Sequence, residues 1–265
     1  MENVTAILPI NSSKNKGFQE LFKGCITSIQ NQSSQIGELI IVHSIEDDLI
    51  NFLIDYDFGD LKYRLVKNEG DTDFASQVNL GVKESKTEWI SIIEFDDEYA
   101  SIWFKNVQTY VDAYPDVNGF LPLVVDVDSK GIFAGFTNEA VFAANMNTDI
   151  GYLSSEVLLN YQNFQSSGMV IRKDSFEKVG GLKKNMKLTF VYEFLLRLSH
   201  NSVKIMTIPR IGYKHTNMRE GSIFWNYKHG ENKLSNDEVS FWLESAKKEY
   251  FFNEDRDIKF ETVNG

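Results

Sequence analysis

Short apolar runs alternate with amphipathic stretches through the first hundred residues of the chain. Four runs have the length and the β-branched content of buried strands: Val4–Pro9, Glu38–His43, Tyr63–Asn68 and Trp89–Ile93. Three segments with apolar residues at helical spacing separate them, at 18–29, 48–56 and 74–83. This alternation predicts an α/β fold with a parallel sheet and helices on both faces.

The pattern loosens after residue 100. It predicts further strands at 119–127, 131–136, 168–172 and 203–211, and helices at 102–114, 174–179, 190–199 and 237–252. Gly180 and Gly181 are expected to end one of these helices, and Asp237 to cap the last. Residues 149–164 fit neither period. Because no repeat or linker interrupts the chain, a single domain over residues 1–265 is expected.

The segment Glu94–Glu98, with sequence EFDDE, follows the fourth predicted strand. In a parallel sheet, ligands bind beyond the carboxyl ends of the strands, which is where this segment would lie. Crowded carboxylates repel one another unless a cation lies between them. Oxygen ligands suit Mg²⁺ or Mn²⁺. A solvated acidic turn is the simpler alternative, but the position at the ligand edge favours a metal site.

Two other features could take part in chemistry. The segment Tyr213–Ser222 groups His215 and Arg219 in a predicted flexible loop, which could close over a diphosphate or be an ordinary surface loop. Glu193 lies four residues before Arg197 in an otherwise apolar helix. It is therefore either part of an ion pair or a carboxylate facing a cleft, where it could act as a general base.

Charge and cysteine content exclude several classes of partner. Lys and Arg number 27 against 38 Asp and Glu, a formal charge of −11. This excess of acidic residues argues against nucleic acid and anionic membranes as binding partners. A small anion could still bind if a metal ion in the site attracted it. A single Cys, Cys25, forms no internal disulfide. With no basic leader and no run of roughly 20 apolar residues, we expect a soluble, cytoplasmic protein without an integral membrane segment.

The order of motifs over about residues 3–225 resembles glycosyltransferase family 2, an inverting family with the GT-A fold. The matching segments are VTAILPINS with Pro9, Ser28–Gln32, Glu38–Ser44, Asn79–Gly81, Thr87–Asp97, Ser167–Arg172 and Val179–Leu182. The resemblance implies a Rossmann-like, mostly parallel central sheet with helices on both faces. It also implies a nucleotide-sugar half at 1–100, an acceptor half at 101–225 and a helical C-terminal tail at 226–265.

The activity that the resemblance implies is transfer of a sugar from a nucleotide-sugar, expected to be a UDP-sugar, to a glycan or other hydroxyl acceptor. Asp96, Asp97 and His215 would bind Mn²⁺ or Mg²⁺, which stabilises the leaving diphosphate. The residues expected to bind the nucleotide-sugar are Pro9, Asn11, His43, Ser44, Asn79, Glu94, Arg219 and Ser222.

The chain departs from the family pattern at two places. His43 and Ser44 replace two acids after the second strand, the first of which holds uracil in the family. Phe190-Val191 stands where the family has the Glu-Asp pair that contains the base. Glu193, the nearest acid, becomes the candidate base, with Asp126 and Asp128 as alternatives.

These departures keep other classes open. A non-catalytic protein that binds a nucleotide-sugar on the same fold is one alternative. A nucleotidyltransferase is another, although residues 10–14 poorly match the Gly-rich basic loop of that class. The aromatic residues near the C-terminus could form an interface in a homo-oligomer.

Overall fold

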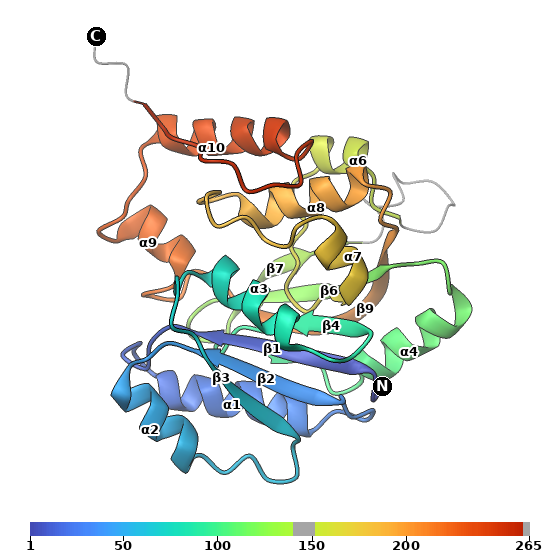
Figure 1. Ribbon diagram of the computed structural model, residues 1–265, viewed down its shortest axis with the longest axis vertical. Coiled ribbons are helices and arrows are strands. Elements are labelled where there is room, and N and C mark those ends of the chain that lie inside the picture. Colours follow the sequence, from blue (N-terminus) through green and yellow to red (C-terminus); the bar gives the residue numbers. More distant parts are fainter. Residues whose placement is uncertain (140–151, 262–265) are drawn as a thin grey trace.

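A single sheet runs through the computed structural model of the chain, which describes residues 1–139 and 152–261. Its nine strands lie in the order β3-β2-β1-β4-β8-β6-β9-β5, and β7 pairs with β6 (Figure 1). The strands are β1 Val4–Ile10, β2 Glu38–His43, β3 Tyr63–Lys67, β4 Trp89–Ile92, β5 Glu98–Tyr99, β6 Gly119–Val127, β7 Phe133–Thr137, β8 Val170–Arg172 and β9 Ile205–Thr216.

The first four strands of this order are parallel, as the alternating pattern predicts. β1 pairs with β2 and β4, and β2 pairs with β3. β8 then runs antiparallel to both β4 and β6, while β6 and β9 are parallel to each other. All seven residues of β1 are buried, because helices cover both of its faces. The carboxyl ends of β1, β2 and β4 therefore meet at one edge.

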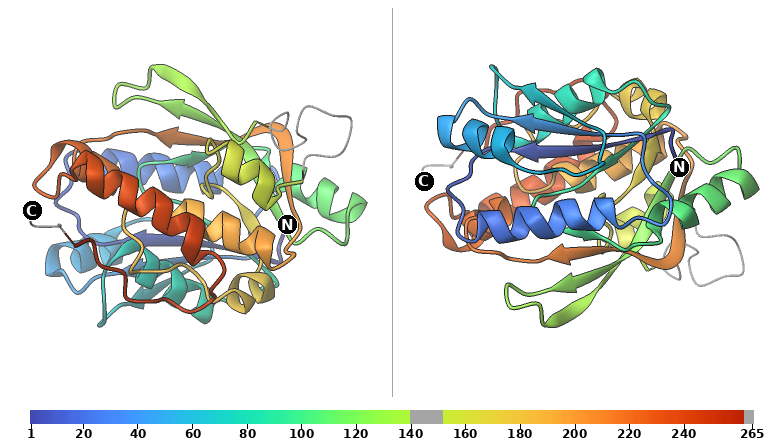
Figure 2. Two further views of the ribbon diagram at one scale, coloured as in Figure 1. Left: turned by 90° about the horizontal axis from the view of Figure 1, so that it is seen from above. Right: turned by 90° about the horizontal axis from the view of Figure 1, so that it is seen from below.

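Two groups of helices cover the sheet (Figure 2). One face carries α1 Phe18–Gln30, α2 Asp47–Asp55 and α4 Trp103–Ala113, whose apolar residues share one core with that side of β1. The other face carries α3 Phe74–Glu84, α6 Ser155–Asn160, α7 Lys173–Lys178, α8 Phe190–His200 and α10 Asn236–Glu249. A short helix, α9 Ile223–His229, connects β9 to α10 and contains no buried residue.

Three details differ from the sequence predictions. β9 continues to Thr216, so that Tyr213–Thr216 of the expected basic loop is strand, because β9 pairs with both β6 and β5. Ser235 rather than Asp237 caps α10, where it forms a reciprocal capping box with Glu238. The ambiguous stretch contains α6, and its residues 149–151 lie outside the described part of the chain. The division into one domain with three parts stays a prediction.

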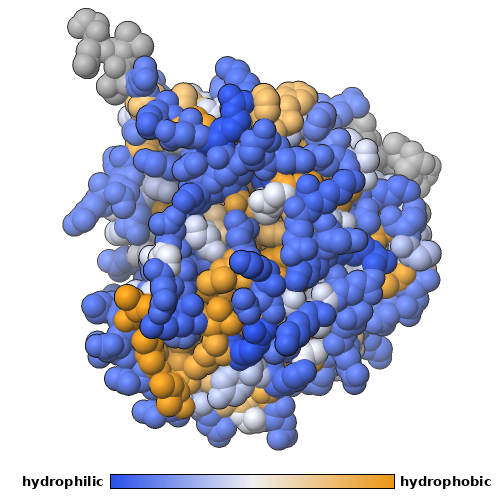
Figure 3. All heavy atoms as spheres, viewed as in Figure 1, coloured by the Kyte–Doolittle hydropathy of each residue, from blue (hydrophilic) through white to orange (hydrophobic). Residues whose placement is uncertain are grey.

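The face seen in Figure 3 is covered mainly by hydrophilic side chains, with an apolar group at lower left over α2 and β3. Exposed apolar residues in these two elements include Ile54 and Tyr63. Within the described ranges, no helix has the length and hydrophobicity needed to cross a bilayer.

The contact of α3 with the sheet depends on Gly81. A Cβ atom at this position would lie 2.5 Å from Cγ2 of Ile7 and 3.0 Å from Cγ2 of Val42. Both neighbours are fully buried β-branched side chains, which have little freedom to move.

We therefore expect Gly81→Ala to lower the free energy of unfolding by about 1–3 kcal/mol through overpacking. Urea denaturation measures this change. Gly135→Ala is the matched control, because a Cβ atom at Gly135 would meet no atom within 4 Å. Equal stability of the two variants would show that α3 does not lie so close to β1 and β2.

Candidate active site

A group of three possible metal ligands lies at the carboxyl edge of the sheet. Ligand atoms of Glu94, Asp97 and His215 all lie within 4.8 Å of one another. The two acids follow β4, and His215 comes from the end of β9, where its register partner in β6 is Asp126. The pairing of β5 with β9, in which Glu98 lies opposite Lys214, brings the acid segment to residues that are more than 100 positions away in the sequence.

Asp97 connects the acid segment to β9. Its Oδ2 lies 3.0 Å from Nδ1 of His215, and its Oδ1 accepts a hydrogen bond of 2.8 Å from the backbone N–H of Thr216. The Thr216 hydroxyl donates to the carbonyl oxygen of Asp96 at 2.7 Å. The two contacts of Asp97 fix the orientation of its side chain, which is almost completely buried.

Asp96 lies beside this group but has a different partner. Nε of Arg219 donates to its Oδ2 at 2.5 Å, and the guanidinium lies 4.8 Å from the centre of the Phe95 ring. Both side chains of the pair are buried. In this structure Asp96, which the sequence predicts as a metal ligand, neutralises Arg219, while Glu94 joins Asp97 and His215.

The proximity of these charges shifts their pKa values. Burial, with help from Asp97 and Asp96, raises the pKa of Glu94 to about 8. Burial and Asp97 also raise the pKa of Asp96, against the opposing effect of Arg219. Burial alone would lower the pKa of His215, but Asp97, Glu94 and Asp126 outweigh it and raise the pKa to about 10. With Glu94 ionised, the three acids carry one more charge than His215 and Arg219 neutralise, and a divalent ion would relieve this excess.

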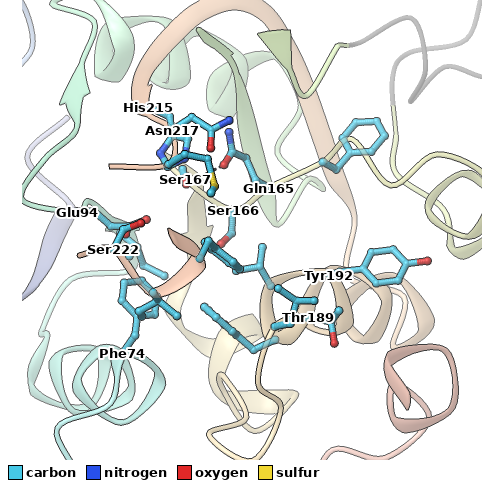
Figure 4. A pocket seen from close by; sticks show the side chains of 18 of the residues that line it. Phe74, Glu94, Gln165, Ser166, Ser167, Thr189, Tyr192, His215, Asn217 and Ser222 are labelled. Carbon is cyan, nitrogen blue, oxygen red and sulfur yellow. Dashed lines mark hydrogen bonds between the residues drawn. The ribbon is translucent and has the colours of Figure 1, made fainter. Parts of the chain in front are cut away.

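A pocket of about 300 Å³ opens beside the three-residue group. Glu94, Asp96 and His215 line one end of it, while Thr189, Phe190, Val191 and Tyr192 from the start of α8 line the other. Figure 4 shows Glu94 and Ser222 near Phe74, with Gln165, Ser167 and Asn217 grouped around His215. The volume is at the lower end of the range for small-molecule sites.

Four of the eight residues expected to bind the nucleotide-sugar, Pro9, Asn11, His43 and Ser44, lie at the ends of β1 and β2, outside this pocket. Pro9 and His43 are the last or second-last residues of these strands. The Ser44 hydroxyl donates to the carbonyl oxygen of Asn11 at 2.5 Å. His43 Nδ1 lies 2.8 Å from the carbonyl oxygen of Ser44. Of the remaining residues, Glu94 and Ser222 line the pocket.

The side chain of Asn79 forms two hydrogen bonds with the backbone of Leu182. Its amide donates to the carbonyl oxygen of Leu182 at 2.8 Å, and its Oδ1 accepts from the Leu182 N–H at 2.9 Å. Sequence reasoning did not find Glu46, which accepts 2.7 Å hydrogen bonds from the hydroxyls of Ser12 and Ser13. Glu46 could have been found as an acid just beyond the second strand, close to positions 43 and 44, where the family pattern has its two acids.

Glu193 lies in the interior, away from the pocket. Its Oε1 is 3.0 Å from Nζ of Lys183 and 2.8 Å from Nε of Arg197, and its Oε2 accepts from Nη2 of Arg197 at 3.0 Å. Lys183 also donates to the carbonyl oxygen of Phe252, and Arg197 to that of Gly181. The cluster of Lys183, Glu193 and Arg197 thus connects α8 to the glycine turn at residues 180–181 and to the segment after α10.

Comparisons with known proteins bear on the family and the fold of the chain. The family model described as glycosyl transferase family 2 matches residues 12–180. The chain belongs to glycosyl transferase family 2. An uncharacterized glycosyltransferase of Haemophilus influenzae is 23% identical over 177 residues, which cover 65% of this chain. The chain spans 55% of the length of that relative.

Solved structures of S. aureus TarS share the fold. TarS 1–349 in complex with UDP-GlcNAc matches with a TM-score of 0.68 and 14% identity, over 93% of this chain and 66% of that one. The complex of TarS 1–349 with UDP matches with a TM-score of 0.63 and 14% identity, over 94% of this chain and 71% of that one. The mixed sheet with helices on both faces is therefore a GT-A fold.

Two acids offered as alternatives to Glu193 also have partners. Asp126 accepts a 2.6 Å hydrogen bond from the Thr137 hydroxyl. Asp128 accepts from the backbone N–H groups of Lys130 and Ile132 in the turn before β7. Neither lines the pocket. Phe190 and Val191, where the sequence resemblance leads one to expect the Glu-Asp pair, line the pocket.

We expect Glu193→Gln to destabilise the protein strongly. Removal of one partner leaves the charges of Lys183 and Arg197 uncompensated in the interior, at a cost of about 3–5 kcal/mol. Urea denaturation measures the loss. Glu244→Gln, which removes an exposed acid paired with Lys247, is the control and should leave the unfolding midpoint almost unchanged. An unchanged midpoint in both variants would contradict the structural role of Glu193.

Proposed function

We propose that the chain is a metal-dependent glycosyltransferase that uses a nucleotide-diphosphate-sugar, a UDP-sugar in the first instance. The group of Glu94, Asp97 and His215 at the end of the pocket carries this proposal. The two carboxylates of this group are oxygen ligands of the kind that suits Mn²⁺ or Mg²⁺. The UDP and UDP-GlcNAc complexes of the similar TarS fold support the choice of donor.

When bound, the ion would stabilise the negative charge that develops on the leaving diphosphate. Thr216 holds Asp97 in position, and Asp97 in turn orients the ring of His215. Arg219 is the nearest guanidinium, and in this structure it binds Asp96. It can release Asp96 and bind a phosphate group instead, because a guanidinium donates parallel N–H groups to phosphate oxygens. Ser222 lines the same end of the pocket and could donate to the diphosphate.

The nucleoside would lie over the ends of β1 and β2. His43 and Ser44 stand there in place of acids, next to Asn11. Uracil presents one N–H donor and two carbonyl acceptors, so a hydroxyl and an imidazole at this edge can both bind it. The phosphates would then reach the end of β4, where the acids lie. The inverting course is the one that family 2 implies.

A second candidate function is a non-catalytic protein that binds nucleotide-sugars. The observation in its favour is that Phe190 and Val191, where the sequence resemblance implies an acidic pair, are apolar and line the pocket. Binding of a UDP-sugar without any turnover would support this alternative over the enzyme.

The metal group can be tested with Asp97→Asn. Because Asp97 both belongs to the metal group and orients His215, we expect UDP in the presence of Mn²⁺ to bind at least about tenfold more weakly. Isothermal titration calorimetry measures the affinity. Glu98→Gln is the matched control: it removes a neighbouring acid that pairs with Lys214 outside the metal group. Equal losses in the two variants would count against the proposed ligands.

Mn²⁺ affinity should rise with pH. In the metal-free protein the pKa values of about 8 for Glu94 and about 10 for His215 keep both groups protonated at pH 6. Metal binding must displace these protons, so each displaced proton contributes up to about a tenfold gain per pH unit below the group's pKa. Titrations at pH 6, 7 and 8 in buffers of different ionisation enthalpy measure affinity and proton release. A flat profile without proton release would contradict the assignment.

A further inference from the structure

The ion pair between Arg219 and Asp96 lies beside the metal group, and both of its members are buried. Nε of Arg219 donates to Oδ2 of Asp96 at 2.5 Å, and Nη1 donates to the carbonyl oxygen of Glu220 at 3.0 Å. The side chain of Arg219 is 9% exposed and that of Asp96 is 7% exposed. A charge buried to this extent strongly destabilises a protein when its partner is removed. A ligand that takes one member of this pair therefore leaves the other in need of a new counter-ion.

The contact with Asp96 uses only part of the hydrogen-bonding capacity of the guanidinium. Nε is the group that donates to the carboxylate in this structure, whereas a guanidinium can donate a parallel pair of N–H groups to the oxygens of a phosphate. A diphosphate also carries more negative charge than a carboxylate. A diphosphate bound at the metal end of the pocket would therefore compete with Asp96 for Arg219.

Arg219 can change its partner without a rearrangement of the strands. It lies in the turn between β9 and α9, whose two ends are held by backbone hydrogen bonds. The Asn217 N–H donates to the carbonyl oxygen of Val127 in β6 at 2.8 Å, and the Ser222 N–H donates to that of Arg219 at 3.0 Å. Because these bonds anchor the backbone on both sides, a change of rotamer in the long Arg219 side chain is enough to move the guanidinium.

Asp96 belongs to the same end of the pocket as the metal group. It lines the pocket there together with Glu94 and His215. Burial, followed by the charge of Asp97, raises the pKa of Asp96, whereas Arg219 lowers it. Once Arg219 has left, Asp96 is a buried carboxylate next to other carboxylates, and a divalent cation at the metal group would compensate its charge.

We propose that Arg219 is an exchangeable counter-ion that couples binding of the diphosphate to binding of the metal ion, an inference that rests on the proposed function. In the empty site Arg219 neutralises Asp96. When a diphosphate binds, Arg219 takes a phosphate as its partner, and the released charge of Asp96 strengthens the attraction for the cation. By linkage, a cation that neutralises Asp96 equally releases Arg219 for the anion.

The coupling is measured as the factor by which saturating UDP raises the affinity of the full chain for Mn²⁺. Isothermal titration calorimetry with Mn²⁺, with and without UDP, gives this factor. UDP also binds Mn²⁺ directly, but that contribution is present in every variant and cancels when variants are compared. In Arg219→Gln no counter-ion is exchanged, and in Asp96→Asn no charge is released. We therefore expect the factor to be at least about tenfold smaller in each than in the wild type.

A double variant gives a sharper readout. Because the exchange needs both groups, the combination of Asp96→Asn with Arg219→Gln should lose no more coupling than either single variant does. It also leaves neither charge buried without a partner, so it keeps the test valid if a single variant unfolds. Thermal denaturation checks the folding of each variant. Glu98→Gln combined with Lys214→Gln is the matched control: it removes a neighbouring ion pair outside the metal group and should keep the wild-type factor.

Arg219→Gln should also have an effect in the absence of UDP. It releases the charge of Asp96 in the empty site, so the affinity for Mn²⁺ alone should rise by about fivefold or more. Lys214→Gln removes a cation from the same edge of the sheet and should give no comparable rise, because its partner Glu98 lies outside the metal group.

Failure of the exchange and failure of the proposed function give different results. A wild-type chain that binds neither UDP nor Mn²⁺ would overturn both. Binding of both ligands, with the wild-type factor retained in Arg219→Gln and Asp96→Asn, would overturn the exchange while the metal-dependent function stands. Losses that multiply in the double variant would also overturn the exchange, since they would reveal independent effects of the two residues.

Discussion

The buried end of β4 holds three carboxylates within four residues, and the rest of the site depends on how their charge is compensated. Burial and the neighbouring carboxylates raise the pKa values of Glu94 and Asp96, so that a nearby cation is needed to keep both ionised. The cations come from β9 and the segment after it: His215 faces Asp97, and Arg219 faces Asp96. A divalent ion at Glu94, Asp97 and His215 would complete this compensation and would also attract a diphosphate.

The second half of the fold brings these cations to the acids and builds the opposite wall of the pocket. β9 pairs with β6 along nearly its whole length and reaches the acid segment through β5. On the other side, the buried Lys183–Glu193–Arg197 cluster fixes α8 against the glycine turn. The start of α8 then presents Phe190 and Val191 to the pocket. One wall is thus ionic and suits a diphosphate, while Phe190 and Val191 make the other wall apolar.

The amino-acid sequence predicted the parallel strands well, because runs such as ELIIVH and WISI are apolar enough to be buried on both faces. It also indicated the acid segment and the basic residues that compensate it. It could not show that Glu94 rather than Asp96 would join His215, since that choice depends on the side-chain pairing of Arg219. The ion pair of Glu193 with Arg197 could be predicted from their spacing of four residues. The contact of Glu193 with Lys183 could not, because it depends on how the turn that contains Lys183 packs against α8.

The central claim is that Glu94, Asp97 and His215 together hold the ion beneath the nucleotide diphosphate. Anomalous diffraction from crystals of the chain grown with UDP and Mn²⁺ tests it most directly. The account predicts a manganese peak within coordination distance of Asp97 and of at least one of Glu94 and His215, in contact with the diphosphate. Ordered UDP with the manganese peak elsewhere, or with none, would contradict it.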